Sequence, residues 1–175
     1  MSHTINLYVL KKASMPDMAG YSDNIPHVEV NGYFLVPLGD KLVNKLGIDY
    51  MTDDYQHKAE YRLSQICPDM AWVETDYFGG VGEQSGKAWK DGKPIAFAGG
   101  TGDISINQAL KAIGVVRTEE RDEFDTINLG RYRSNHSVTN EWEEVTGKTT
   151  EKTLRRLLLK VIPKEMKLFW EEERI

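Results

Sequence analysis

Apolar and polar residues alternate along several short stretches of the chain. Residues 4–11 follow this pattern, which is typical of a strand because successive side chains point to opposite faces. Two further strand-like runs, 27–30 and 33–36, flank the pair Asn31-Gly32. That pair favours a type I′ turn, in which both central residues adopt positive φ. The pattern therefore predicts a strand followed by a β-hairpin.

A second hairpin is predicted in the middle of the chain. Met70–Phe78 alternates as a strand, and a glycine-rich loop follows it over residues 79–86. Residues 87–90 and 94–98 then flank Asp91-Gly92, another pair that is typical of tight turns between strands.

Helical spacing of apolar residues predicts three helices before residue 114. We expect them over residues 40–46, 52–66 and 103–113, with Asp40 and Asp103 as N-terminal caps of the first and last. The middle helix begins at a cap supplied by Thr52 or Asp53.

The last third of the chain has a mixed pattern. Val115 and Val116 suggest a short strand, and residues 118–138, which have weak periodicity, suggest a long ordered loop. An apolar stripe over residues 154–162 predicts a helix, and Pro163 permits another to start. Lys152, Arg155, Arg156 and Lys160 form the basic, solvent-facing side of the first of these helices.

Together these elements predict an α+β fold. We expect an antiparallel sheet built from hairpins, with helices packed on it and helices at the C-terminus, in a single globular domain over residues 1–175. Strands and helices do not alternate regularly, so a doubly wound parallel sheet is not expected.

Composition and charge narrow the class of protein. The net charge is -5, which argues against a general nucleic-acid binder. One cysteine rules out an internal disulfide framework and a cysteine-based zinc cluster. No apolar run is long enough to span a membrane, and the N-terminus does not resemble a signal peptide. We therefore expect a cytoplasmic protein that binds neither nucleic acid nor membrane.

Two glycine-rich segments invite a nucleotide-binding interpretation. In Gly79–Lys87 the spacing of a phosphate loop fails, because Val81 stands where the first glycine belongs and Ala88 replaces the hydroxyl residue. Residues 99–103 lack the third glycine of a dinucleotide fingerprint, and their Asp103 would repel phosphate. We interpret the first segment as a connection or a surface recognition loop and the second as a turn before a helix cap.

Other candidates for catalytic chemistry are incomplete. None of the four histidines, His3, His27, His57 and His136, has metal-ligand spacing to another. Cys67 precedes Pro68 at a helix end, where a small apolar filler is expected. We predict no catalytic residue, no metal site and no cofactor.

Acidic and aromatic residues gather in two segments. Glu74 and Asp76 share one side of the predicted strand, with Tyr77 and Phe78 beside them. Such a pair could serve acid–base chemistry, sugar binding or the docking of basic side chains, and it could also be a solvated face. The second segment contains Asp122, Glu123, Asp125, Arg131 and Arg133, which either pair locally or form a contact surface.

Residues 73–82, 106–110 and 122–125 resemble small uncharacterised bacterial proteins, some of which act as toxin-immunity or phage-accessory proteins. The resemblance transfers no catalytic residue. The lack of a complete catalytic set, the acidic charge balance and the aromatic and acidic residues of the strand favour an inhibitory or immunity-type module that neutralises a basic protein partner such as a toxin. A small enzyme or ligand-binding protein, with a site near Glu74, Asp76 and the glycine-rich loops, is the alternative. A pocket lined by these residues would favour the alternative, and a flat acidic surface would favour the binding module. The partner-binding residues are predicted to be Glu74, Asp76, Tyr77, Phe78, Asp122, Glu123, Asp125, Arg131 and Arg133.

Overall fold

The computed structural model describes residues 2–15, 24–79, 81–96 and 104–147. The chain divides into two compact units, Met1–Trp142 and Glu143–Ile175. The first unit contains the sheet and every site discussed below.

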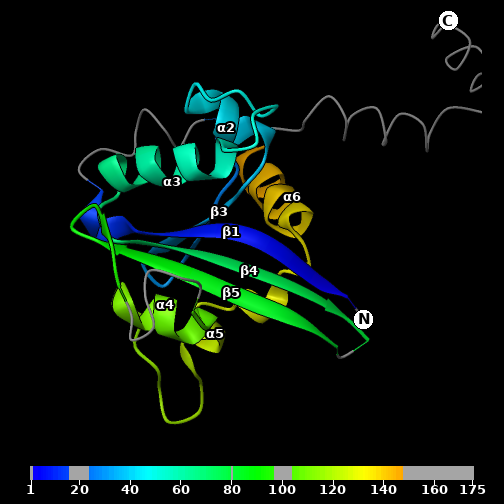
Figure 1. Cartoon of the computed structure of the whole chain (residues 1–175). Helices are drawn as coiled ribbons and strands as arrows, with labels where there is room; N and C mark the ends of the chain where they lie inside the picture. Colours follow the sequence, from blue (N-terminus) through cyan, green and yellow to red (C-terminus); the bar gives the residue numbers. More distant parts are fainter. Residues whose placement is uncertain (1, 16–23, 80, 97–103, 148–175) are drawn as a thin grey trace, which may run out of the picture. The chain divides into compact units, whose positions relative to one another are not determined.

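A six-stranded antiparallel sheet forms the centre of this unit, in the order β2-β3-β1-β4-β5-β6 (Figure 1). The expected α+β fold with an antiparallel sheet is therefore confirmed. The strands are β1 (His3–Lys11), β2 (Val28–Val30), β3 (Tyr33–Pro37), β4 (Met70–Phe78), β5 (Val81–Lys90) and β6 (Lys93–Pro94).

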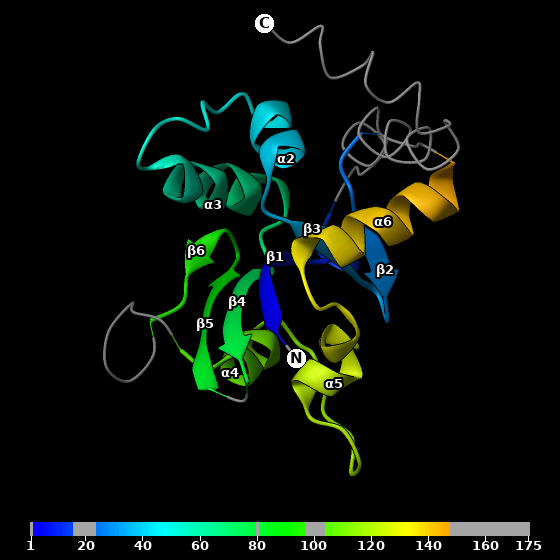
Figure 2. The ribbon, with the colours of Figure 1, turned by 90° about the vertical axis from the view of Figure 1, so that its right-hand side faces the viewer.

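Helices cover both faces of the sheet. Helices α2 and α3 lie on one face, and α4 and α5 lie on the other, as the view in Figure 2 shows. Short 3-10 turns at Lys12–Ser14 and Leu129–Arg131 complete the described elements. The helices are α2 (Asp40–Lys45), α3 (Tyr55–Ile66), α4 (Ile106–Ala112), α5 (Glu123–Thr126) and α6 (Asn135–Thr146).

Each face of the sheet has its own apolar core. In β1, Leu7 and Val9 belong to the core beneath α4, whereas Tyr8 and Leu10 belong to the core beneath α2 and α3. All four side chains are at most 3% exposed, because this part of the strand is covered on both faces. Apolar residues therefore run consecutively there, as is typical of a strand between two helical layers.

Both predicted turns are present. Asn31 and Gly32 have φ values of 49° and 82°, and Asp91 and Gly92 have φ values of 53° and 73°. Positive φ at both central residues is the requirement of a type I′ turn, so these two dipeptides fix the predicted hairpins.

Three helix starts differ from the sequence prediction. Gly39, not Asp40, is the N-cap of α2, and α3 begins at Tyr55 after Asp54. Helix α4 is capped by Ser105, whose side chain accepts a hydrogen bond from the Gln108 backbone, while Gln108 Oε1 accepts from the Ser105 backbone. This reciprocal capping box satisfies two backbone donors, which a single cap would not do.

The glycine-rich segment after β4 is a strand rather than a loop. β5 starts at Val81 and pairs with β4 over its whole length, from Phe78 opposite Val81 to Met70 opposite Trp89. Backbone pairing decides this segment, because residues with little strand propensity can still complete a ladder with a well-packed neighbour. The predicted strand over residues 94–98 is shorter than expected, since β6 ends at Pro94.

The predicted long loop over residues 118–138 is also wrong, because it contains α5, a 3-10 turn and the start of α6. Conversely, Val115 and Val116 form no strand. The turn expected over residues 99–103 and the C-terminal helices expected beyond residue 150 lie outside the described residues, whereas the cap expected at Asp103 is wrong because Ser105 caps α4.

Candidate functional site

Strands β1, β4 and β5 continue as a three-stranded arm beyond the area covered by α3 (Figure 1), with β1 beside β4 as far as His3 opposite Tyr77. One face of this arm carries two adjacent cross-strand pairs, Asp76 opposite Glu83 and Phe78 opposite Val81. Phe78 and Val81 are each 81% exposed. Together with Glu74, these four residues form what we call the acidic hairpin face. It places an apolar tip next to a group of carboxylates.

Hydrogen bonds from β1 hold the carboxylates of this face. Glu74 Oε1 accepts a hydrogen bond of 3.0 Å from Asn6 Nδ2, and Asn6 Oδ1 accepts one of 2.8 Å from Trp72 Nε1. Asp76 Oδ1 accepts a bond of 3.3 Å from Thr4 Oγ1. Glu74 is half-buried and oriented by this chain of bonds, whereas Asp76 remains exposed. The face is thus built partly in advance of any binding.

A notch of about 380 Å³ adjoins these carboxylates. The start of α6 and the residue before it form its far wall. This wall is held to β1 by a hydrogen bond from Thr4 N to the Arg133 carbonyl and one from Asn6 N to Asn135 Oδ1. The lining residues are Thr4, Ile5, Asn6, Glu74, Thr75, Asp76, Ser134, Asn135 and His136. A cationic side chain would find two carboxylates in this notch.

The opposite face of the same strands opens into a larger cavity, which we call the polar pocket. Its volume is about 550 Å³. Strands β1, β4 and β5 form its floor, and residues of α4, α5 and the segment after α5 form its walls. The lining residues are His3, Thr75, Tyr77, Gln84, Asn107, Asp122, Phe124, Gly130 and Arg133.

His3 is buried in the wall of the polar pocket. Its Nδ1 shares a hydrogen bond of 2.7 Å with Thr75 Oγ1, whereas its Nε2 has no hydrogen-bond partner among the described residues. Burial lowers the pKa of His3 below its ordinary value of 6.5; the polar backbone at Leu129 opposes this change, and the positive charge of Arg133 adds to it. The imidazole is therefore neutral near pH 7.

A separate set of hydrogen bonds fixes the opposite wall. Asn107 Nδ2 donates to Asp122 Oδ2 at 2.9 Å, and Asn107 Oδ1 accepts from the Phe124 backbone at 2.9 Å. Asp122 Oδ1 also accepts from the Asp125 backbone and caps α5. Both oxygens of Asp122 thus have structural partners, and α4 and α5 are joined by one amide side chain.

The structure divides the sequence-predicted residues between these surfaces. Glu74, Asp76 and Phe78 lie on the acidic hairpin face, whereas Tyr77, Asp122 and Arg133 line the polar pocket on the other side. Because alternate residues of a strand face opposite ways, one predicted surface becomes two.

The three remaining predicted residues join neither surface. Glu123 is only 7% exposed, Asp125 lies exposed on α5, and Arg131 pairs with Glu141 at 2.9 Å. The local pairing of Arg131 is one of the two interpretations that its charge allowed.

Sequence reasoning missed His3, Thr75 and Gln84 as members of a site. Register brings them together, since His3 pairs with Tyr77 and Thr75 pairs with Gln84 across neighbouring strands. No local motif marks them, although the alternation of β4 would have placed Thr75 on the same side as Tyr77.

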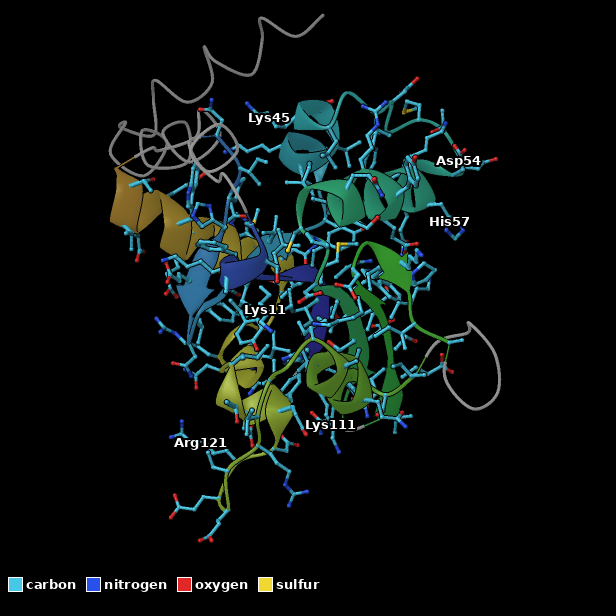
Figure 3. The ribbon with its side chains drawn as sticks, turned by 90° about the vertical axis from the view of Figure 1, so that its left-hand side faces the viewer. Lys11, Lys45, Asp54, His57, Lys111 and Arg121 are labelled. Carbon is cyan, nitrogen blue, oxygen red and sulfur yellow. The ribbon has the colours of Figure 1, made fainter. Side chains whose placement is uncertain are left out.

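The other sequence candidates have structural surroundings. Cys67 is buried at the C-terminal end of α3, and burial raises the pKa of its thiol to about 12, so the thiol is protonated near neutral pH. His57 projects outward from α3 (Figure 3), and its Nδ1 lies 3.3 Å from Glu60 Oε2. Within the described ranges, no three His, Cys, Asp or Glu side chains gather as a metal site, and no helix is long and apolar enough to cross a membrane.

Comparisons of this chain with protein-family models, with curated proteins and with solved structures find no match. Function is therefore inferred from the two surfaces at the end of the sheet.

Proposed function

We propose that this protein is a binding module that docks a basic protein partner on its acidic hairpin face, in the manner of an inhibitory or immunity protein. The observation that supports the proposal is the pairing of Asp76 with Glu83 directly beside the exposed pair Phe78 and Val81. A central apolar contact surrounded by charged residues is a common arrangement in protein interfaces.

The acidic pair itself favours a cationic partner. Like charges directly opposite each other on neighbouring strands destabilise a sheet, so Asp76 and Glu83 repel each other in the free protein. A lysine or arginine from a partner would relieve that repulsion. The notch beside Glu74 offers such a side chain a place between the carboxylates and the start of α6.

Each part of the face has a different expected effect on binding. Exposed carboxylates mainly accelerate association by long-range attraction, and salt screens this effect. Phe78 loses its large exposure only when the partner is bound, so its contribution is expected in the dissociation rate.

The experiment is to retain a partner from a lysate of the native host on the immobilised protein and then to measure kinetics with the purified pair. We expect Asp76→Lys with Glu83→Lys to slow association about tenfold at low salt and to flatten its salt dependence. The matched control is Glu119→Lys with Glu120→Lys, which makes the same change in net charge at exposed residues elsewhere.

Equal association rates for the two double variants would contradict the proposed face, because the effect would then follow net charge alone. Phe78→Ser should raise the dissociation rate and leave association nearly unchanged. If the partner dissociates from this variant no faster than from the wild type, Phe78 is not part of the interface.

The notch supports a second candidate, a small-ligand or enzyme site that uses Glu74 and Asp76. Two carboxylates on one strand face beside a notch of about 380 Å³ are consistent with acid–base chemistry or with binding of a polar small molecule. Native mass spectrometry of protein purified from its host tests this candidate. A bound small molecule that is lost in Glu74→Gln would favour it over the binding module.

A further inference from the structure

We infer that the polar pocket is a second binding site, specific for a small organic carboxylate whose charged group pairs with Arg133 and whose body packs against Phe124. The site lies on the opposite side of β4 from the acidic hairpin face. It is therefore independent of the proposed function.

Three side chains of the pocket form no hydrogen bond or ion pair with other described residues and are open to a ligand. Arg133 is exposed and forms no ion pair with any residue that the structure describes. Among the same residues, the Tyr77 hydroxyl and the Gln84 amide also have no hydrogen-bond partner. They come from three segments, β4, β5 and the chain before α6, and all line one cavity. Such convergence is typical of a ligand site.

The unused groups are mainly donors, and the charged one is a guanidinium. Arginine presents parallel N–H groups that match the two oxygens of a carboxylate. The Asp122 carboxylate in the same wall already accepts bonds from Asn107 Nδ2 and the Asp125 backbone, so it does not take up this capacity. A ligand oxyanion would complete the hydrogen bonding of Arg133.

The buried imidazole adds an independent indication. His3 is only 9% exposed, and its Nε2 has no hydrogen-bond partner of normal geometry within the described part of the chain, although the Leu129 backbone interacts with the imidazole and raises its pKa. An unpaired polar group at this depth costs free energy and is uncommon in structural positions. The His3 ring also lies 5.9 Å from the Phe124 ring, so the pocket combines polar atoms with an aromatic wall.

The charge of the pocket selects among anions. The pocket contains the guanidinium of Arg133, a neutral imidazole and the carboxylate of Asp122. This balance of charge suits a monoanion better than a phosphate, which carries more than one negative charge at pH 7. The volume of about 550 Å³ falls within the range of small-molecule sites, so there is room for a ring or a short chain behind the carboxylate.

The test is a titration of the isotope-labelled full chain, followed by heteronuclear NMR, with benzoate as the probe and benzamide and inorganic phosphate as comparisons. We expect benzoate at millimolar concentration to shift the resonances of the pocket, including the His3 ring. The neutral amide should have little effect, because it lacks the charge that pairs with Arg133.

Two variants and one control locate the effect. Arg133→Gln should weaken benzoate binding about tenfold, and Tyr77→Phe should weaken it by a smaller factor. The control is Arg131→Gln, which removes a nearby guanidinium that already pairs with Glu141. Its affinity for benzoate should stay within about twofold of the wild-type value. A well-dispersed spectrum of each variant shows that it is folded.

Three results would overturn the inference: no shift at the pocket residues, equal shifts with benzamide, or tighter binding of phosphate than of benzoate. Charge reversal at Asp76 and Glu83 should leave the benzoate shifts unchanged. Failure of the carboxylate site is therefore distinguishable from failure of the proposed partner surface.

Discussion

Thr75 and Asp76 are adjacent in the chain but belong to different environments. Thr75 is 2% exposed and bonds to the buried ring of His3, whereas Asp76 is exposed on the acidic hairpin face. Single substitutions can therefore change one surface while they leave the backbone and the other surface in place.

At His3, burial has a consequence for stability at low pH. Its pKa is lowered in the folded state by burial and by Arg133, so the unfolded chain takes up a proton first as pH falls below about 6.5. The free energy of unfolding is then expected to fall between about pH 7 and about pH 5. The variant His3→Asn keeps a polar group near Thr75 but has no imidazole to protonate. Its free energy of unfolding should therefore fall less over this pH interval.

Urea unfolding of both proteins at several pH values measures this difference. The comparison isolates His3, because the other three histidines are present in both chains. Identical pH dependence would show that His3 is not protected from protonation in the folded protein.

Gly32 supplies the second prediction at this scale. Its φ of +82° is costly for any residue with a Cβ, and no atom lies within 4 Å of the position that a Cβ would occupy, so the penalty is conformational alone. Gly32→Val should reduce the free energy of unfolding by at least about 1 kcal/mol.

Chemical denaturation provides the measurement for Gly32→Val. Gly39→Ser is the matched control, since Gly39 has extended backbone and open space around it, and serine is also favoured at the N-cap of α2. If the valine variant unfolds at the wild-type urea midpoint, the turn does not require positive φ at this position.

At the scale of elements, one part of the β4–β5 hairpin could be predicted from the sequence and another part could not. The alternation of Met70–Phe78 and the Asp91-Gly92 pair predicted β4 and one turn correctly. The first half of β5 resembles a loop in sequence because Gly82 and Gly86 have low strand propensity. Close packing explains both glycines: a Cβ at Gly82 would clash with the backbone carbonyl of Asp76, and one at Gly86 would lie 2.9 Å from Ala109 Cβ on α4.

This close approach predicts the effect of a larger residue. Gly86→Val would push α4 away from β5, and overpacking of this kind costs about 1–3 kcal/mol. Thermal unfolding measures the loss. Adding Ala109→Gly should recover part of it if contact between these two residues is the cause, and simple additivity of the two substitutions would contradict that explanation.

The helices after residue 118 were missed for a different reason. Helix α5 has only four residues, too few to show periodicity, although its cap Asp122 bonds to the Asp125 backbone as a local sequence signal would allow. Ser105 and Gln108 likewise form a capping box that is readable in the sequence. Capping residues in the sequence therefore mark where α4 and α5 begin, but they do not show how long these helices are.

At the scale of the whole unit, sequence distance limits the prediction of a site. Tyr77, Asp122 and Arg133 were singled out in the sequence, and the pocket brings them together. His3 joins them only because β1 runs antiparallel to β4. A long-range pairing of this kind leaves no local pattern, so the division into an acidic face and a polar pocket could not be read from one strand.

The two surfaces are expected to act independently. They occupy opposite sides of β4, and the strand between them is held by β1 and β5 along its length. Benzoate should therefore change partner affinity by less than about twofold, and a saturating partner should change benzoate affinity by the same small factor. Calorimetric titrations in both orders measure this coupling, and a large factor in either order would show that the sheet transmits a change between its faces.

The burial of Cys67 gives this chain a built-in reporter of opening. It is the only cysteine in the sequence, it is 0% exposed, and its Sγ donates towards the carbonyl oxygen of Asp69 at 3.2 Å. An alkylating reagent can reach the thiol only when the junction between α3 and β4 separates. The alkylation rate therefore measures how often this junction opens. A cysteine placed at exposed Val81 could be labelled selectively while Cys67 remains protected.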